Sequence, residues 1–215
     1  TEQLIALLSH PNKWHRHTAV RLLGERKDPA GAPRLKEILG RDAGLTALNA
    51  LWALHQSGHL DQKTAHRALQ HSYAPVRMWA VRLLADARQL DRATAQAIEF
   101  QAKLEHDAEV RSQMAASARR LPPGQGLPIV AALLAHDEDL HDPYLPLLCW
   151  WALEAWSAEY RESLLEVFRG SALWDRPVVF EEILPRLMRR YALEGRQRDL
   201  LTCAQWLRLA PSPRH

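Results

Sequence analysis

Apolar residues recur along the chain at the spacing of an α-helix rather than of a β-strand. Leu4, Leu7 and Leu8 share one face of a helix, and Leu22 and Leu23 continue the three- and four-residue rhythm further on. We find no alternating Val/Ile/Thr run bounded by Asn-Gly or Asp-Gly, the pattern that predicts a β-hairpin. The chain is therefore predicted to be all-α.

The predicted helices fall into antiparallel pairs separated by Pro, Gly and Asp. A last helix over 197–209 follows the pairs, and residues 211–215 are expected to form a tail or linker. We expect residues 1–210 to form a single helical-repeat domain. The predicted pairs are 2–9 with 13–26, 30–40 with 44–57, 62–71 with 75–87, 91–105 with 108–120, 125–136 with 143–157, and 159–169 with 177–193.

A phrase of sequence recurs across these pairs. It begins at His10-Pro11-Asn12-Lys13-Trp14-His15-Arg16, returns at His71-Ser72-Tyr73-Ala74-Pro75-Val76-Arg77, and has a looser copy at His106-Asp107-Ala108-Glu109-Val110-Arg111. Self-similarity at a period of about 20–50 residues indicates stacked structural repeats. Such repeats serve mostly as extended binding surfaces.

The arginine of this phrase marks a register within the second helix of a pair. Four residues before it, Asn12 and Asp107 are predicted helix N-caps, because their side chains accept a free backbone N–H of the first turn. Three residues after it, a helical face carries a residue that we expect to pack against a neighbouring helix. These residues are Ala19, Ala80 and Met114.

The run from Asp107 to Arg111 resembles the HEAT-repeat consensus, in which a capping Asp precedes Val-Arg on the second helix. The resemblance implies a right-handed α-solenoid of about six antiparallel helix pairs. It also implies that Asp107 and Arg111 take part in a ladder of side chains between neighbouring repeats.

Three further stretches resemble a narrower family, the HEAT-like region of the large multidomain PVC-type haem-binding CxxCH proteins. In that family the region follows a β-propeller and precedes a c-type cytochrome segment. The resemblance implies an exported or periplasmic, dehydrogenase-like electron-transfer protein as the parent. Because CxxCH is absent here, it implies no haem or other cofactor for this chain. The stretches are 8–26, 50–54 and 183–191.

Composition narrows the function classes. The chain has 28 Lys and Arg against 25 Asp and Glu, for a net charge of +3, which favours internal ion pairs over a nucleic-acid surface. Cys149 and Cys203 lack metal-ligand spacing, so we expect two unrelated buried thiols, with one disulfide as the alternative. A start at Thr1 without Met leads us to expect a fragment of a longer protein.

Two groups of residues are candidates for partner binding. The first is a set of arginines that could face an anionic partner. The alternative, which we favour, is that they pair with Asp and Glu of adjacent repeats. The second is a cluster of tryptophans with a glutamate. We expect the tryptophans that recur with the repeat, Trp14, Trp52 and Trp79, to pack between repeats instead. The candidates are Arg16, Arg21, Arg77, Arg82 and Arg111, and Trp150, Trp151 and Glu154.

No motif for a nucleophile, a phosphate loop, a dinucleotide or a zinc protease is visible. His55 and His59 have the spacing of two metal ligands, but Gly58 between them is expected to end the helix. We therefore predict no catalytic, metal or cofactor residues, and a scaffold that docks neighbouring domains or another protein. The alternative is a HEAT-like DNA-binding protein resembling alkylpurine DNA glycosylases; a small-molecule site is a weaker third hypothesis.

Overall fold

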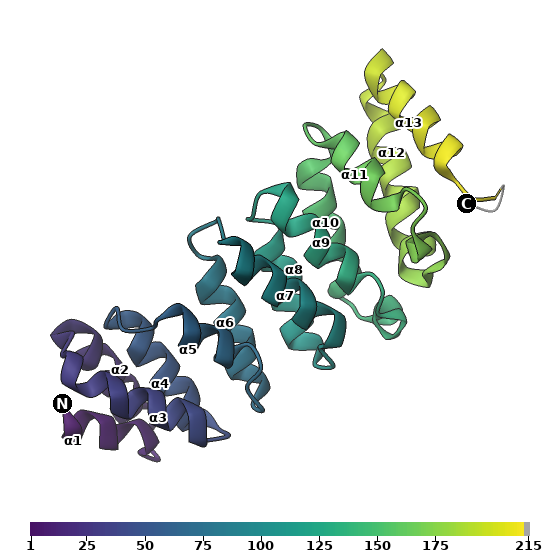
Figure 1. Cartoon of the computed structure of the whole chain (residues 1–215). Coiled ribbons are helices and arrows are strands. Elements are labelled where there is room, and N and C mark those ends of the chain that lie inside the picture. Colours follow the sequence, from purple (N-terminus) through teal and green to yellow (C-terminus); the bar gives the residue numbers. More distant parts are fainter. Residues whose placement is uncertain (213–215) are drawn as a thin grey trace. The chain divides into compact units, whose positions relative to one another are not determined.

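The computed structural model describes residues 1–212, and within them every regular element is a helix. Two compact units are present, one of residues 1–84 and one that begins at Ala85 (Figure 1). Each is described by itself. The prediction of an all-α fold is confirmed; the single domain over 1–210 stays a prediction, and residues 213–215 of the expected tail lie outside the described residues.

Unit 1 alternates two kinds of helix, which we call A and B in the order of the chain. Short 3-10 turns at Leu7–Ser9 and Pro29–Gly31 border α1 and α3. The A helices are α1 (Glu2–Ala6), α3 (Ala32–Arg41) and α5 (Gln62–Ala68), and the B helices are α2 (Lys13–Arg26), α4 (Leu45–Gln56) and α6 (Ala74–Ala85).

Unit 2 continues the alternation and ends on one more helix. A π-helical stretch, Val179–Ile183, leads into its last B helix, and 3-10 turns lie at Asp137–His141 and Ala172–Asp175. The A helices are α7 (Arg92–Leu104), α9 (Pro123–Leu133) and α11 (Arg161–Phe168). The B helices are α8 (Ala108–Ala118), α10 (Leu145–Ser157) and α12 (Leu184–Glu194), and α13 (Gln197–Leu209) follows.

The observed helices match the predicted ranges closely, with differences at their ends. The helix predicted over 125–136 begins at Pro123, because the fixed φ of proline suits the first helical turn. It ends at Leu133, and the Asp137–His141 turn that follows was not predicted. The handedness of the solenoid and the number of pairs stay predictions.

The predicted caps and packing positions are confirmed. Asn12 accepts the N–H of Trp14 at 2.9 Å, and Asp107 accepts the N–H of Glu109 at 3.0 Å. Each cap satisfies a backbone donor that the first turn of a helix leaves free. The three small or flexible residues of the B helices, Ala19, Ala80 and Met114, are all buried.

Gly58 ends α4, as predicted from the sequence. Its φ is +77°, and the N–H of His59 donates to the carbonyl of Leu54 at 2.9 Å while Gly58 donates to His55 at 3.0 Å. This is the Schellman arrangement, which needs a left-handed residue after the helix. His55 and His59 are consequently not on one continuous helix.

Candidate functional site

Three arginines of the repeated phrase brace the loop between an A helix and the next B helix. Each donates from Nη1 to the backbone carbonyl of the residue six positions before it, which supplies a partner to a loop carbonyl. The pairs are Arg16 with His10 (2.7 Å), Arg77 with His71 (2.8 Å) and Arg111 with Glu105 (2.8 Å).

The same loop residue has a second role, which corrects the alignment of the third copy. His10 accepts, through Nδ1, the backbone N–H two residues later at 3.0 Å, and His71 does the same at 3.0 Å. In the third copy the acceptor is Oε1 of Glu105, also at 3.0 Å, and not His106. Glu105 therefore occupies the histidine position, because both side chains offer an acceptor at that reach.

Arg111 is engaged inside unit 2. Its Nε donates to Oδ2 of Asp139 at 2.7 Å, its Nη2 pairs with the other carboxylate oxygen, and both side chains are buried. Burial lowers the pKa of the Arg111 guanidinium, but the hydrogen bond and charge of Asp139 outweigh it and the pKa is raised. The geometry supports internal pairing for this arginine, in the manner that the HEAT resemblance implies.

Arg21 and Arg82, five residues after the bracing arginines, are exposed instead. Arg21 pairs with Glu25 one turn later on α2. The guanidinium of Arg82 lies over the ring of Trp79, 5.1 Å from its centroid. The five candidate arginines thus divide into three that brace loops and two that face solvent from the B helices of unit 1.

Contacts among three aromatic rings and one guanidinium join the B helices of unit 1, which are α2, α4 and α6. His17 of α2 meets Trp52 of α4 at 6.0 Å between centroids, and Trp52 meets Trp79 of α6 at 5.0 Å. Both ring contacts are edge-to-face, with interplanar angles of 84° and 81°, a favoured aromatic geometry. We call the set His17, Trp52, Trp79 and Arg82 the unit 1 ladder.

The prediction that the repeating tryptophans pack between repeats is confirmed for two of the three. Trp52 and Trp79 are half-buried and contact each other across α4 and α6. The prediction is wrong for Trp14, which is 67% exposed. Trp14 sits at the first helical turn, where its ring meets only the edge of His15 among described aromatic rings.

The B helices of unit 1 carry an unbalanced charge. Within α2, α4 and α6 a single acid, Glu25, stands against six Lys and Arg. Three histidines lie on the same helices. The cations are Lys13, Arg16, Arg21, Arg26, Arg77 and Arg82, and the histidines are His15, His17 and His55.

The second candidate group lies on α10 of unit 2. Trp150 is 9% exposed and Trp151 43%, because adjacent residues point about 100° apart around a helix. Oε1 of Glu154 is 3.8 Å from Nε of Arg190 on α12, so this carboxylate has a cationic neighbour. The group therefore lacks the surplus of positive charge that the B helices of unit 1 carry.

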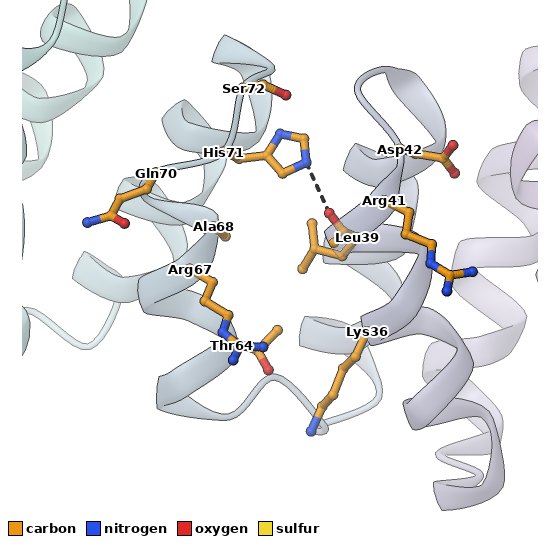
Figure 2. Close-up of a pocket in the computed structure, with 11 residues that line it drawn as sticks. Lys36, Leu39, Arg41, Asp42, Thr64, Arg67, Ala68, Gln70, His71 and Ser72 are labelled. Atoms are coloured by element: carbon orange, nitrogen blue, oxygen red, sulfur yellow. Dashed lines mark hydrogen bonds between the residues drawn. The ribbon is translucent and has the colours of Figure 1, made fainter.

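A cleft of about 410 Å³ opens between α3 and α5 of unit 1 (Figure 2). His71 crosses it, with Nε2 3.0 Å from the carbonyl of Leu39. Its cations are partly neutralised, because Lys36 pairs with Asp61 and Arg41 with Glu37. This hydrogen bond ties the loop before α6 to α3, the A helix of the previous pair.

The described residues hold no group of three or more His, Cys, Asp or Glu placed to bind a metal ion. Across residues 1–212 no helix has the length and apolar character needed to cross a membrane. Cys149 and Cys203 are both free thiols; Cys149 is buried as predicted, but the prediction of burial is wrong for Cys203, which is half-buried. Burial, followed by the charge of Asp139, raises the pKa of Cys149 to about 12, which makes it a poor nucleophile.

Comparison with known proteins finds one family model that matches part of the chain. Residues 1–71 match the family model described as HEAT repeats. No curated protein and no solved structure matches the chain. With the alternating helices described above, the match shows an all-α, HEAT-like solenoid fold; the narrower PVC-type parent is not shown.

The exposed arginines could be named from the sequence, but the ladder could not. Trp52 and Trp79 were expected to pack between repeats, but the periodicity of a single sequence does not show which rings of different repeats meet. One pattern pointed to this surface in advance. Trp14, His17 and Arg21 follow one another at three- and four-residue spacing, which places them on one helical stripe.

Proposed function

We propose that this chain is a non-catalytic helical-repeat interaction domain whose binding surface is the B-helix face of unit 1. HEAT-like repeats generally serve as scaffolds, since stacking leaves long faces of successive helices free for a partner. The observation that carries the proposal is the unit 1 ladder. Exposed arginine beside half-buried tryptophan is the composition that dominates binding energy in protein interfaces.

A photo-crosslinking amino acid at His17 tests the surface, with the same probe at Lys63 as the matched control. His17 is exposed on α2 and Lys63 is exposed on α5, an A helix of the same unit. In the intact parent polypeptide, we expect crosslinks to another domain or another protein from position 17 and few from position 63. Equal yields at both positions would contradict the proposal.

We further propose the setting of this domain, which rests on the resemblance of residues 8–26, 50–54 and 183–191. In that setting it is the helical segment of an exported, dehydrogenase-like electron-transfer protein, and its partners include the neighbouring domains. The flanking sequence and the visible spectrum of the intact parent test this. A downstream CxxCH with a c-type haem spectrum supports the setting, and a parent without either contradicts it while leaving the crosslinking test intact.

A further inference from the structure

We propose that the unit 1 ladder binds an acidic, extended segment of a partner protein. This proposal rests on the proposed function and names the chemistry of the partner. The first argument is charge. The exposed stripes of α2, α4 and α6 present Arg21, Arg82, His17 and His55, and the only acid of these helices, Glu25, is already paired with Arg21. A row of positive side chains lowers the free energy of binding for an anionic partner and raises its association rate.

The second argument is what the positive side chains do inside the protein. Arg16 and Arg77 each donate a hydrogen bond to a loop carbonyl, and the charge of Arg111 is neutralised by the buried Asp139. The guanidinium of Arg82 instead lies over the ring of Trp79, and its N–H groups remain available to an acceptor outside the chain. A carboxylate matches that fork with two parallel hydrogen bonds.

The third argument is the shape of the ladder. Its members run from α2 through α4 to α6, with neighbouring centres 5.0 to 6.0 Å apart. An extended chain rises about 3.3 Å per residue. About five residues therefore match the length of the three ladder contacts placed end to end. Half-buried indoles supply apolar area for alternate side chains of such a segment while the intervening carboxylates reach the arginines.

Protein is favoured over nucleic acid by the orientation of the rings. A strand of nucleic acid binds by stacking its bases on open aromatic faces. In the ladder the rings meet edge-to-face, and one face of Trp79 is covered by Arg82.

Fluorescence anisotropy of labelled peptides tests the proposal with the whole chain. The probe is a peptide of about a dozen residues that repeats Asp-Glu-Phe, and its control repeats Asn-Gln-Phe. We expect the acidic peptide to bind at least about tenfold more tightly than the neutral control, because the control cannot form charge-assisted hydrogen bonds to the arginines. Its affinity should fall as salt rises from about 20 mM to about 500 mM, because the charges are exposed.

Arg82→Gln should weaken the acidic peptide about tenfold, because a charge-assisted hydrogen bond is lost. The matched control is Arg169→Gln, which removes the same charge from an exposed site of unit 2 and should leave binding unchanged. Circular dichroism of both variants confirms the fold.

Equal binding of the neutral peptide, equal loss in Arg169→Gln, no binding at all, or tighter binding of a labelled oligonucleotide would each overturn the acidic-segment proposal. Crosslinking from position 17 would separate the two proposals, because a partner captured there after a failed peptide titration leaves the surface in place and removes only the acidic segment.

Discussion

Arg82 of unit 1 and Arg111 of unit 2 both lie on B helices and have opposite surroundings. Arg82 is exposed over a tryptophan ring, whereas Arg111 is buried against the carboxylate of Asp139. The helices follow the same contrast. In unit 1 the B helices hold six Lys and Arg and one acid, while α8, α10 and α12 of unit 2 hold four Arg and three Glu.

The contrast shows that one repeat pattern supports two uses of positive charge. A repeat needs its bracing arginine to satisfy loop carbonyls, and this need is met in both units. In unit 2 a buried carboxylate, Asp139, joins the brace at Arg111. In unit 1 a further, exposed arginine, Arg82, lies beside a ladder of rings. We therefore assign Arg111 to the stability of unit 2 and Arg82 to a partner.

The largest expected effect is that of Arg111→Ala. Removing the guanidinium leaves Asp139 buried without its cation, which typically costs about 3–5 kcal/mol. Arg82→Ala, at an exposed site, should change stability by at most about 0.5 kcal/mol. Urea unfolding of both variants measures the difference. Equal stabilities would break the assignment of Arg111 to the interior.

Close packing gives the next effect, with one glycine in each unit. A Cβ at Gly126 would lie 2.5 Å from Trp156 and 2.7 Å from the carbonyl of Ala118, so Gly126→Ala should destabilise unit 2 by about 1–3 kcal/mol. In unit 1, Gly24→Ala should cost less, because the contact at 2.8 Å is with Gln56 near the end of α4.

Gly124 is the control for both variants, since a Cβ added there would meet no described atom within 4 Å. Gly124→Ala should leave the thermal midpoint unchanged or raise it slightly, because alanine favours the helix. A larger loss of stability from Gly24→Ala than from Gly126→Ala would contradict the closer packing that we assign to the glycine of unit 2.

Acid should affect the caps of α7 and α2 differently. The hydroxyl of Thr94, followed by its backbone N–H, lowers the pKa of Asp91 at the start of α7. A lowered folded-state pKa stabilises the fold above the unfolded value of about 3.9, and this contribution is lost as the pH falls. The cap of α2, Asn12, carries no titrating group.

Asp91→Asn should therefore flatten the decline of the thermal midpoint between about pH 5 and about pH 3, while keeping a capping side chain. Thermal unfolding across that range measures the slope. Asn12→Asp provides the converse, since it gives α2 a titrating cap and should steepen the decline. An unchanged slope in both variants would show that neither cap contributes to the acid response.

The smallest effect is on thiol reactivity, which reports on unit 2 alone because both cysteines lie there. With a pKa raised to about 12 and a buried side chain, Cys149 should not react with a disulfide reagent near neutral pH until unit 2 unfolds. Burial also raises the pKa of Cys203, which is only half-buried, so it should react first and slowly. Fast labelling of Cys149 in the native chain would contradict its burial.

Much of the fold could be predicted from the sequence because helical repeats depend on local patterns. Periodic leucines located the helices, Asn12 and Asp107 located their starts, and Gly58 located an end. The loop position of Glu105 could not be found by matching letters, since a carboxylate replaces an imidazole there. Glu105 shares with His10 and His71 only the ability to accept a backbone hydrogen bond at this position.

The candidate surface was less predictable, because it depends on contacts between repeats. The residues Arg21 and Arg82 could be named from the sequence, but their exposure could not be separated from the burial of Arg111. The buried partner, Asp139, lies in a 3-10 turn that periodicity did not predict. The meeting of His17, Trp52 and Trp79 depends on the registry of three helices far apart in sequence.

Hydrogen–deuterium exchange of the whole chain, with and without the Asp-Glu-Phe peptide, tests the central claim most directly. The claim is that unit 1 binds a partner through its B helices, while Arg111 on α8 of unit 2 is structural. We predict that the peptide slows exchange in α2, α4 and α6 and leaves α8 and α10 unchanged. Protection confined to α8 and α10, or equal in both units, would contradict it.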